Sequence, residues 1–498
     1  MKFDNICIVG GGSAGWMTAS VLAKHFGDAK EIVLIESPTK PRIGVGEATT
    51  QFFNTFVRYL GLEDSDWMPK CDATYKHSVR FDNFNPNGSF HYPFGDMNGP
   101  ASIADYYTWR KGKPIHSMTF GMIYSDVIRS VEKGKIIPDL LKFRVGYHFD
   151  AILFADYLKH NYAIPRGVKL IEDTVHEVKS CVDGVSGVRL SSGDWHNYDL
   201  FIDCTGFDAL LTNAVDSEWE SWNDELVCDR AITTRLEYTD KQEQLVAHTN
   251  CTGMSSGWVW KAPTWSRIGT GYVYSSRHQD EESALKEFQK HLVDSKGICP
   301  NCVDKQYYKK LAFPTGVRKE IWKKNVVSIG LAAGFIEPLE SGGLFSVHEF
   351  LFNLIGVLPK DRDNYNGFIR EQFNWGSKRR LKSFKDFVLA HYCLSPRDDT
   401  PFWKHYNQMN FESEFPDVLT QRFEQIQNLN YLSEGAVYLL GGYEYDIIPD
   451  RFDILANEQG YQIPEFNDMF EDALKRQDPD YPTPLEYYQS TLYKTEDS

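Results

Sequence analysis

The N-terminal stretch alternates between short apolar runs and a segment of helical composition. Residues 6–9 and 31–35 are apolar and rich in β-branched side chains, whereas residues 14–26 have the composition of a helix. Glycines at positions 10–15 separate the first run from the helix. This strand–helix–strand order is the start of a βαβ unit and predicts a parallel sheet.

Two later apolar runs end in small residues, one over residues 200–206 and the other over residues 326–330. Each is typical of a buried parallel strand whose carboxyl end opens onto a ligand crevice. We therefore expect an α/β fold with a Rossmann-like core.

The pattern changes after residue 343. Apolar residues recur at helical spacing until Pro359, and a similar pattern returns over residues 384–391. We expect residues 1–350 to hold the dinucleotide-binding and substrate regions, and residues 351–498 to form a mostly helical subdomain. From about residue 476 the chain is rich in Pro, Asp and Tyr, which predicts a tail on the surface.

Composition narrows the class of protein. The 498 residues suggest about three domains' worth of chain at roughly 150 residues each. Lys+Arg of 53 against Asp+Glu of 69 gives 53 − 69 = −16, which argues against nucleic-acid or anionic-membrane binding. Neither a membrane-spanning apolar run nor a signal peptide is found, so we expect a cytoplasmic protein.

The nine cysteines are scattered along the chain, as in a reduced protein. Cys299 and Cys302 have CxxC spacing, but no second pair accompanies them, so we interpret them as part of a loop and expect no metal site. The sequence leaves the oligomeric state open, including a homo-oligomer.

The glycine-rich segment satisfies GxGxxG through Gly10, Gly12 and Gly15. These glycines allow a tight turn, close approach of a pyrophosphate and close helix–strand packing, respectively. Glu36 ends the second predicted strand, where a ribose-binding carboxylate is expected. The alternative is a glycine-rich turn with a solvent-facing glutamate. The motif itself does not distinguish NAD from FAD.

Further motifs carry a resemblance to a known family. They are, in chain order, GGGSAGWMTA (10–19), GVGEAT (44–49), ATYKHSVRF (73–81), GWVWKAP (257–263), FIEPLESGGL (335–344) and SPRDDTPFW (395–403). With these motifs the sequence resembles the flavin-dependent halogenases of the tryptophan-halogenase-like family, which are related to flavin monooxygenases. The resemblance implies a flavin-monooxygenase-like FAD module with an interleaved substrate sheet.

The resemblance also implies the reaction. Reduced FAD and O2 oxidise a halide, which is chloride, bromide or iodide, to hypohalous acid. This acid passes through an internal tunnel to a lysine beside an electron-rich arene, which is halogenated by electrophilic aromatic substitution. We find no second GxGxxG for a nicotinamide cofactor, so we expect a separate flavin reductase to supply the reduced FAD.

The positions that the resemblance assigns to FAD lie in four parts of the chain. They are Gly10, Gly12, Ser13, Ala14, Gly15, Glu36, Ser37, Ile43, Val45, Gly46, Glu47, Ala48, Val175, Gly330, Leu331 and Leu344.

Lys76 matches the family's catalytic lysine. By alternation it shares a strand face with Ser78, Arg80 and Asp82, and this pattern alone predicts a solvated polar face. The resemblance demands the opposite, because a lysine that holds hypohalous acid needs a dry pocket.

Glu340 matches the family's second catalytic residue, although a carboxylate just before a helix can also complement the helix dipole. Gly342 and Gly343 match the backbone halide site and precede a helix expected to begin at Leu344. The family usually has threonine at the position of Gly342, so we expect the glycine to widen the site and to favour bromide or iodide over chloride. A flexible turn is the alternative for this pair.

Trp258, Trp260 and Pro263 match the halogenase signature, in which the tryptophans keep the organic substrate away from the flavin; ordinary core aromatics are the alternative. The substrate positions are His91, Tyr92 and Phe94, with Tyr92 where histidine is usual. In the family's free-tryptophan halogenases a tryptophan from the C-terminal region contacts the substrate ring, but no tryptophan follows Trp403 here. Residues 428–445 also do not reproduce the family's contacts with the amino and carboxylate groups of tryptophan.

We therefore expect a small indole-like or phenolic substrate rather than free tryptophan. A flavin monooxygenase that hydroxylates its substrate and a non-catalytic flavin-binding protein are the alternative functions.

Overall fold

The computed structural model describes the greater part of the chain. The described residues are 3–42, 44, 47–94, 132–136, 138, 141, 145–296, 303–358, 360, 366–409, 439, 442–443 and 481–494. The chain divides into two compact units, each drawn from three segments. Unit 1 comprises Met1–Ala73, Phe149–Leu226 and Phe313–Lys382, and unit 2 comprises Thr74–His148, Val227–Ala312 and Ser383–Ser498.

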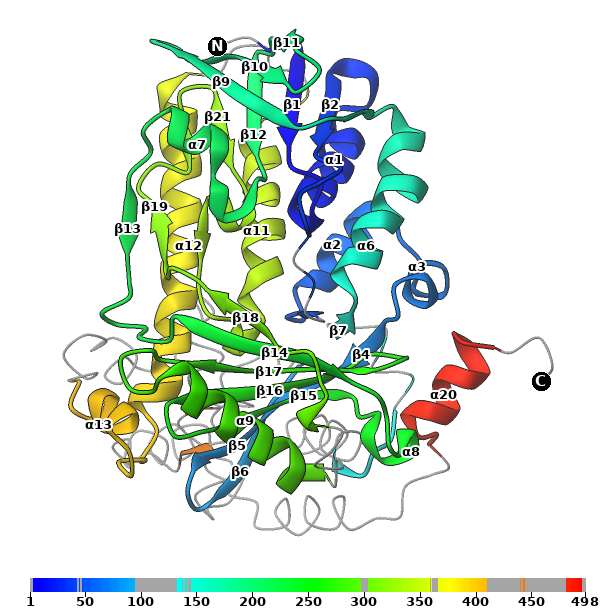
Figure 1. Ribbon diagram of the computed structural model, residues 1–498. Coiled ribbons are helices and arrows are strands. Elements are labelled where there is room, and N and C mark those ends of the chain that lie inside the picture. The colour runs from blue at the N-terminus through cyan, green and yellow to red at the C-terminus, as the bar shows by residue number, and fades with distance from the viewer. Residues whose placement is uncertain are drawn as a thin grey trace, which may run out of the picture. The chain divides into compact units, whose positions relative to one another are not determined.

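Unit 1 is built on a six-stranded sheet in the order β20-β21-β12-β1-β2-β8 (Figure 1). All neighbours pair in parallel except β20 with β21, which confirms the predicted parallel sheet. The strands are β1 (Asn5–Val9), β2 (Glu31–Glu36), β8 (Lys169–Glu172), β12 (Leu200–Asp203), β20 (Trp322–Lys323) and β21 (Val326–Ser328).

Helices and two small sheets complete unit 1. One small sheet has the order β11-β10-β9, and residues of β10 pack with β1 and β12 in a hydrophobic cluster. The helices are α1 (Ser13–Phe26), α2 (Phe53–Leu60), α3 (Asp64–Lys70), α6 (Ala151–Tyr157), α7 (Leu210–Ala214) and α11 (Gly342–Val357). The strands of the small sheets are β9 (Val175–Cys181), β10 (Gly184–Leu190), β11 (Trp195–His196), β13 (Trp219–Ser221), β19 (Gly316–Arg318) and β22 (Gly334–Phe335).

Unit 2 contains a seven-stranded sheet in the order β18-β14-β17-β16-β15-β5-β6 (Figure 1). Only β15 and β5 pair in parallel within it. Helix α9 (Glu281–Lys296) packs on this sheet through Ala284, Phe288 and Leu292. The strands are β5 (Ser78–Asn85), β6 (Gly88–Pro93), β14 (Arg230–Leu236), β15 (His248–Gly253), β16 (Gly257–Pro263), β17 (Ile268–Tyr274) and β18 (Lys309–Ala312).

A short strand of unit 2, β4, lies just before β5 in the chain. Strand β4 (Thr74–Lys76) pairs in antiparallel orientation with β7 (Gly146–Phe149), and Lys76 lies opposite Gly146. The long helix α12 (Gly367–Cys393) confirms the helical pattern expected around residues 384–391.

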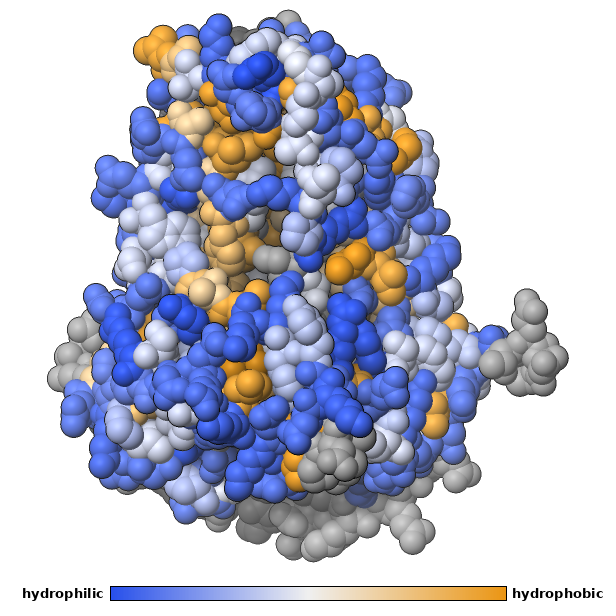
Figure 2. Space-filling view, in the orientation of Figure 1, coloured by the Kyte–Doolittle hydropathy of each residue, from blue (hydrophilic) through white to orange (hydrophobic). Residues whose placement is uncertain are grey.

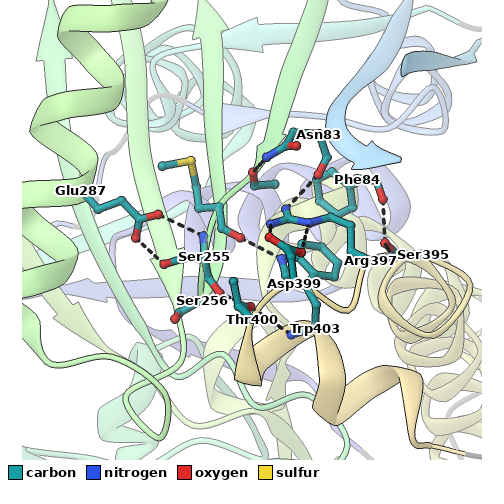
Figure 3. A network of polar contacts seen from close by, with 12 residues as sticks. Asn83, Phe84, Ser255, Ser256, Glu287, Ser395, Arg397, Asp399, Thr400 and Trp403 are labelled. Carbon is teal, nitrogen blue, oxygen red and sulfur yellow. Dashed lines mark hydrogen bonds and ion pairs between the residues drawn. The ribbon is translucent and has the colours of Figure 1, made fainter. Parts of the chain in front are cut away.

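Polar contacts fix the segment after α12 to the unit 2 sheet (Figure 3). The Arg397 guanidinium donates to the Asn83 carbonyl at 2.9 Å and lies 4.4 Å from the Trp403 ring centroid. Trp403, in α13 (Pro401–Asn407), donates its ring N–H to the Met254 carbonyl at 2.8 Å. Residues 395–403, one of the motifs of the family resemblance, thus contact both strand β5 and the turn between β15 and β16.

The expected surface tail is only partly observed. Residues Pro484–Thr491 form helix α20, and Tyr488 is 1% exposed. Proline and aspartate made the segment resemble a tail, but a proline at the first helical position is compatible with a helix.

Hydrophilic side chains cover much of the face of each unit seen in Figure 2. Within the described ranges, no helix is both long enough and apolar enough to cross a bilayer.

Candidate functional site

The three glycines of the GxGxxG motif have different neighbours in unit 1. Gly10 has φ +114°, and a Cβ there would lie 2.3 Å from the Cys204 carbonyl oxygen. A Cβ at Gly15 would lie 1.8 Å from the Gly10 oxygen, so helix α1 and the turn touch through backbone. A Cβ at Gly12 would meet nothing within 4 Å. Space is therefore open where a pyrophosphate would approach the loop.

The N-terminus of α1 offers a site for that pyrophosphate. Gly12 is the N-cap, no side chain caps the helix, and its first turn carries no acidic residue. The first N–H groups of a helix lack intrahelical acceptors and attract anions. The Ser13 hydroxyl donates to the Ala151 carbonyl at 3.1 Å, so the free backbone N–H groups of this turn would be available to a phosphate.

Glu36, the last residue of β2, is buried beside the same loop. A Cβ at Gly11 would lie 2.3 Å from the Glu36 carboxyl carbon, and the carboxylate forms ion pairs with Arg42 and, at 3.0 Å, with Lys159. Burial works against the charge of Lys159, but the bonds to Glu36 and Glu172 raise its pKa. A carboxylate has lone pairs for further donors, so a ribose hydroxyl fits. The alternative of a solvent-facing glutamate is wrong.

The remaining positions assigned to FAD are partly brought together. Ser37 exchanges a hydrogen bond of 2.7 Å with Thr174, the residue before Val175. Gly330 has φ +69°, and a Cβ there would lie 2.9 Å from the Ala14 Cβ. Leu331 follows in the same short 3-10 helix, Glu47 and Ala48 form β3 (Glu47–Ala48), and Ile43, Val45 and Gly46 lie outside the described residues.

Asp203 is a residue of this site that sequence reasoning missed. It ends β12, is fully buried, and one carboxylate oxygen accepts from the Leu211 and Thr212 amides at 2.8 and 2.7 Å. The other oxygen accepts from the Thr205 amide and hydroxyl. Asp203 thereby fixes the turn whose Cys204 carbonyl lies against Gly10. Its place before the small residues CTG was the available signal.

The start of α11 holds the residues expected to bind halide. The helix begins at Gly342, two residues before the predicted start at Leu344, and Gly342 and Gly343 are its first two residues. Ser341 adopts a left-handed conformation, φ 62° and ψ 35°, which is uncommon for a residue with a Cβ. A Cβ at Gly343 would meet nothing within 4 Å, so there is open space beside the first turn of α11 at this position.

Glu340 comes immediately before this turn, in a short 3-10 helix (Pro338–Glu340). Its side chain is 2% exposed. Leu344, which the resemblance assigns to FAD, is also buried in the first turn of α11. Unit 1 therefore places a buried carboxylate two residues before the N-terminus of α11.

Lys76 lies in unit 2 and has no exposed surface. The solvated polar face that alternation predicts is wrong, because the chain does not continue as one strand through His77. Strand β4 ends at Lys76 and pairs with β7, whereas β5 begins at Ser78 and pairs with β15 and β6. The burial that the family resemblance demands is confirmed.

Two buried histidines lie near Lys76, His148 in space and His77 as the next residue in the chain. Burial, and then the charge of Lys76, lower the pKa of His148 well below its usual range. Its Nε2 lies 2.8 Å from the Thr249 hydroxyl and its Nδ1 lies 3.4 Å from the Thr74 hydroxyl. Burial also lowers the pKa of His77 to about 4. Both histidines are therefore uncharged at neutral pH.

Aromatic rings form a wall beside Lys76. Its Nζ lies 5.1 Å from the Phe94 ring centroid, and Tyr92 meets Phe94 edge to face at 5.8 Å. The His91 Nδ1 lies 3.0 Å from the Ser78 hydroxyl. The three predicted substrate residues therefore lie on or next to β6 in the same unit as the lysine.

The halogenase signature lies on β16. Trp258 and Trp260 are buried with ring centroids 6.1 Å apart, which fits both the signature and the core interpretation. The Pro263 carbonyl accepts a hydrogen bond of 2.6 Å from the Thr74 hydroxyl. The end of the signature is therefore bonded to the strand that carries Lys76. Cys299, Cys302 and most of residues 428–445 lie outside the described residues.

Comparison with known proteins agrees with this geometry. The family model for tryptophan halogenase matches residues 5–457. The tryptophan 7-halogenase RebH of Lentzea aerocolonigenes is 34% identical over 427 residues, covering 81% of this chain and 78% of that protein. The VirX1 apo structure superposes with a TM-score of 0.85 at 31% identity, over 99% of this chain and 100% of that one.

A second solved structure, Xcc4156, is described as a flavin-dependent halogenase from Xanthomonas campestris. It has a TM-score of 0.82 at 25% identity and covers 99% of each chain. The fold and these similar proteins define a flavin-dependent halogenase, which is an enzyme. The chain belongs to the tryptophan halogenase family. Membership implies a flavin, a halide and O2 as reactants, a separate flavin reductase and an aromatic substrate.

Proposed function

We propose that this halogenase uses Lys76 to hold hypohalous acid beside a small electron-rich arene, either indole-like or phenolic. The observation that carries the proposal is the complete burial of Lys76 with its Nζ 5.1 Å from the Phe94 ring centroid. Lysine is almost never fully buried, since an ammonium loses its hydration there. Such a costly placement beside an aromatic wall is typical of a reactive site.

Bound FAD, once reduced by a separate reductase, would activate O2, and O2 would be the oxidant that converts halide to hypohalous acid. In unit 1 we assign diphosphate binding to the open backbone at Gly12 and ribose binding to Glu36. The same unit would hold halide on the amides of Gly342 and Gly343. We assign activation of the halogenating species to Glu340.

In unit 2 the Lys76 amine binds the hypohalous acid and orients its halogen. The arene lies against Phe94 and Tyr92, so that ring carbon attacks the halogen and water leaves: Ar–H + HOX gives Ar–X + H2O. The apolar and uncharged side chains around Lys76 exclude bulk water, into which hypohalous acid would otherwise escape. Similar proteins are named as tryptophan halogenases. This chain does not reproduce the family's contacts with the charged groups of tryptophan, which favours a substrate that lacks those groups.

The test supplies FAD, NADH, a flavin reductase, O2 and each halide to a panel of indoles and phenols, with mass spectrometry of the products. We expect a halogen to be added to one or more arenes, and the Lys76→Met variant to lose that product. Lys261→Met, which removes a half-buried lysine on β16, is the matched control and should retain activity.

Addition of oxygen in place of halogen would instead support a hydroxylase. Full halogenation by Lys76→Met would remove Lys76 from the mechanism.

A further inference from the structure

Helix α20 contacts the strand that carries Lys76. The Tyr488 hydroxyl oxygen accepts a hydrogen bond of 2.7 Å from the backbone N–H of Tyr75, the residue before Lys76. The Tyr488 ring also stacks on the Tyr75 ring, with centroids 6.1 Å apart and an interplanar angle of 25°. Both contacts lie within unit 2 and join positions 413 residues apart.

Strand β4 needs such a contact. It is only three residues long, and β7 is its neighbour along one edge. An edge strand leaves backbone groups on its other side without a ladder partner. Tyr488 satisfies one of these groups, the amide adjacent to Lys76, in a fully buried position where an unpaired N–H would be costly.

Helix α20 is itself fixed at both ends. Thr483 and Glu486 form a capping box at its start, and the Pro482 carbonyl accepts from the Ile136 amide at 2.9 Å. Past its end, Tyr493 stacks on Trp265 at 4.3 Å, and the Lys241 ammonium lies 3.2 Å from that indole's centroid. A helix held in this way can fix the position of β4.

The match to the family model ends at residue 457, and α20 begins at Pro484. We propose that α20 is a latch on the Lys76 strand and that Tyr488 is a positioning residue for halogen transfer. This inference rests on the proposed function of Lys76. The hydroxyl fixes the backbone of Tyr75, and the Lys76 side chain takes its position from that backbone.

The experiment compares Tyr488→Phe with Tyr487→Phe in the full chain, with FAD, reductase, O2 and halide. Tyr487 lies on the same helix, and its ring meets the Tyr75 ring edge to face with centroids 6.3 Å apart. Tyr487→Phe is therefore a matched control that also removes one hydroxyl group. We measure the halogenated arene formed per flavin oxidised, together with amide hydrogen exchange of the peptide containing residues 74–77.

We expect Tyr488→Phe to lower the yield of halogenated arene about tenfold while flavin oxidation continues at the wild-type rate. A displacement of 1 Å in a reacting group can cost on the order of 100-fold, so a small shift of Lys76 suffices. Exchange of the β4 peptide should become faster, and Tyr487→Phe should resemble the wild type. Thr483→Ala, which removes the capping box, should move both readouts in the same direction and serves if Tyr488→Phe does not fold.

Wild-type yield in both Tyr488→Phe and Thr483→Ala would overturn the latch, even if Lys76→Met is inactive. Full activity of Lys76→Met would overturn the proposed function instead. In the Lys76→Met background, Tyr488→Phe should cause no additional loss of arene product, and a further tenfold loss would contradict positioning through Lys76.

Discussion

The Nζ of Lys76 lies 5.1 Å from the centroid of the Phe94 ring. A cation over an aromatic face at this distance is attracted by the ring quadrupole, by about 0.5–2 kcal/mol depending on desolvation. Phe94 follows β6, and its amide donates to the His77 carbonyl at 2.7 Å. The ring is therefore tied to the residue that follows Lys76, and the pair forms a unit that can orient both oxidant and arene.

Phe94→Leu should weaken substrate binding more than it weakens the fold. Leucine keeps most of the apolar volume but removes the stacking surface, which is worth about 0.5–1.5 kcal/mol. We expect the KM for an indole to rise about 2- to 10-fold, since 1.4 kcal/mol corresponds to tenfold. Steady-state kinetics with the arene varied checks this, and an unchanged KM would exclude Phe94 from the substrate wall.

Gly12→Ala and Gly15→Ala should separate cofactor binding from folding. A Cβ at Gly12 meets no protein atom, so Gly12→Ala should keep the wild-type melting temperature and weaken FAD binding about tenfold or more. A Cβ at Gly15 would collide with backbone, so Gly15→Ala should destabilise unit 1 by about 3 kcal/mol. Thermal melting and FAD titration measure the two effects. Unchanged FAD affinity in Gly12→Ala would contradict the assigned diphosphate site.

His348→Phe should make unit 1 less sensitive to acid. Burial lowers the pKa of His348 to about 3, and neither ring nitrogen has a hydrogen-bond partner among the described residues. The unfolded histidine has a pKa of about 6.5, so the unfolded state binds the extra proton between pH 6.5 and pH 3. Stability is therefore lost as pH falls through that window, by about 2 kcal/mol at pH 5.

Phenylalanine suits this position because Phe53, Phe345 and Phe352 surround the ring. Urea unfolding of both proteins at pH 7 and pH 5 measures the difference. The variant should lose less free energy of unfolding on acidification. Parallel losses in the two proteins would show that His348 does not contribute.

Gly342→Thr should change the halide preference. A glycine where threonine is usual leaves the start of α11 wider, so the wild type should favour bromide or iodide over chloride. Restoring the side chain should shift the preference toward chloride. Competition with equal halide concentrations and mass spectrometry of the products checks this, and a clear chloride preference in the wild type would contradict the wider site.

The nucleotide-binding part of the fold could be predicted from sequence because its signals are local. Strands β1, β2, β12 and β21 are buried on both faces, and such strands form continuous apolar runs. The glycine spacing then places the loop between β1 and α1. Helix α11 was also predicted, although its start was misplaced by two residues because glycines seldom begin a helical pattern.

The surroundings of Lys76 could not be predicted in the same way. The alternation of Lys76 with polar neighbours indicates a surface strand. No signal in the adjacent sequence shows that β4 ends at Lys76 or that this strand is buried. The contact with Tyr488 comes from a segment whose composition resembles a tail. Burial of this kind depends on residues hundreds of positions apart, which local patterns do not contain.

The most direct test of the account measures where the oxidised halogen goes in Lys76→Met. With FAD, reductase, O2, halide and an arene, a soluble scavenger intercepts any hypohalous acid released from the protein. We predict that flavin oxidation and scavenged halogen persist while halogenated arene falls at least about 100-fold, since the amine no longer holds the oxidant beside the ring. Halogenated arene formed at the wild-type rate, with no increase in scavenged halogen, would contradict the account.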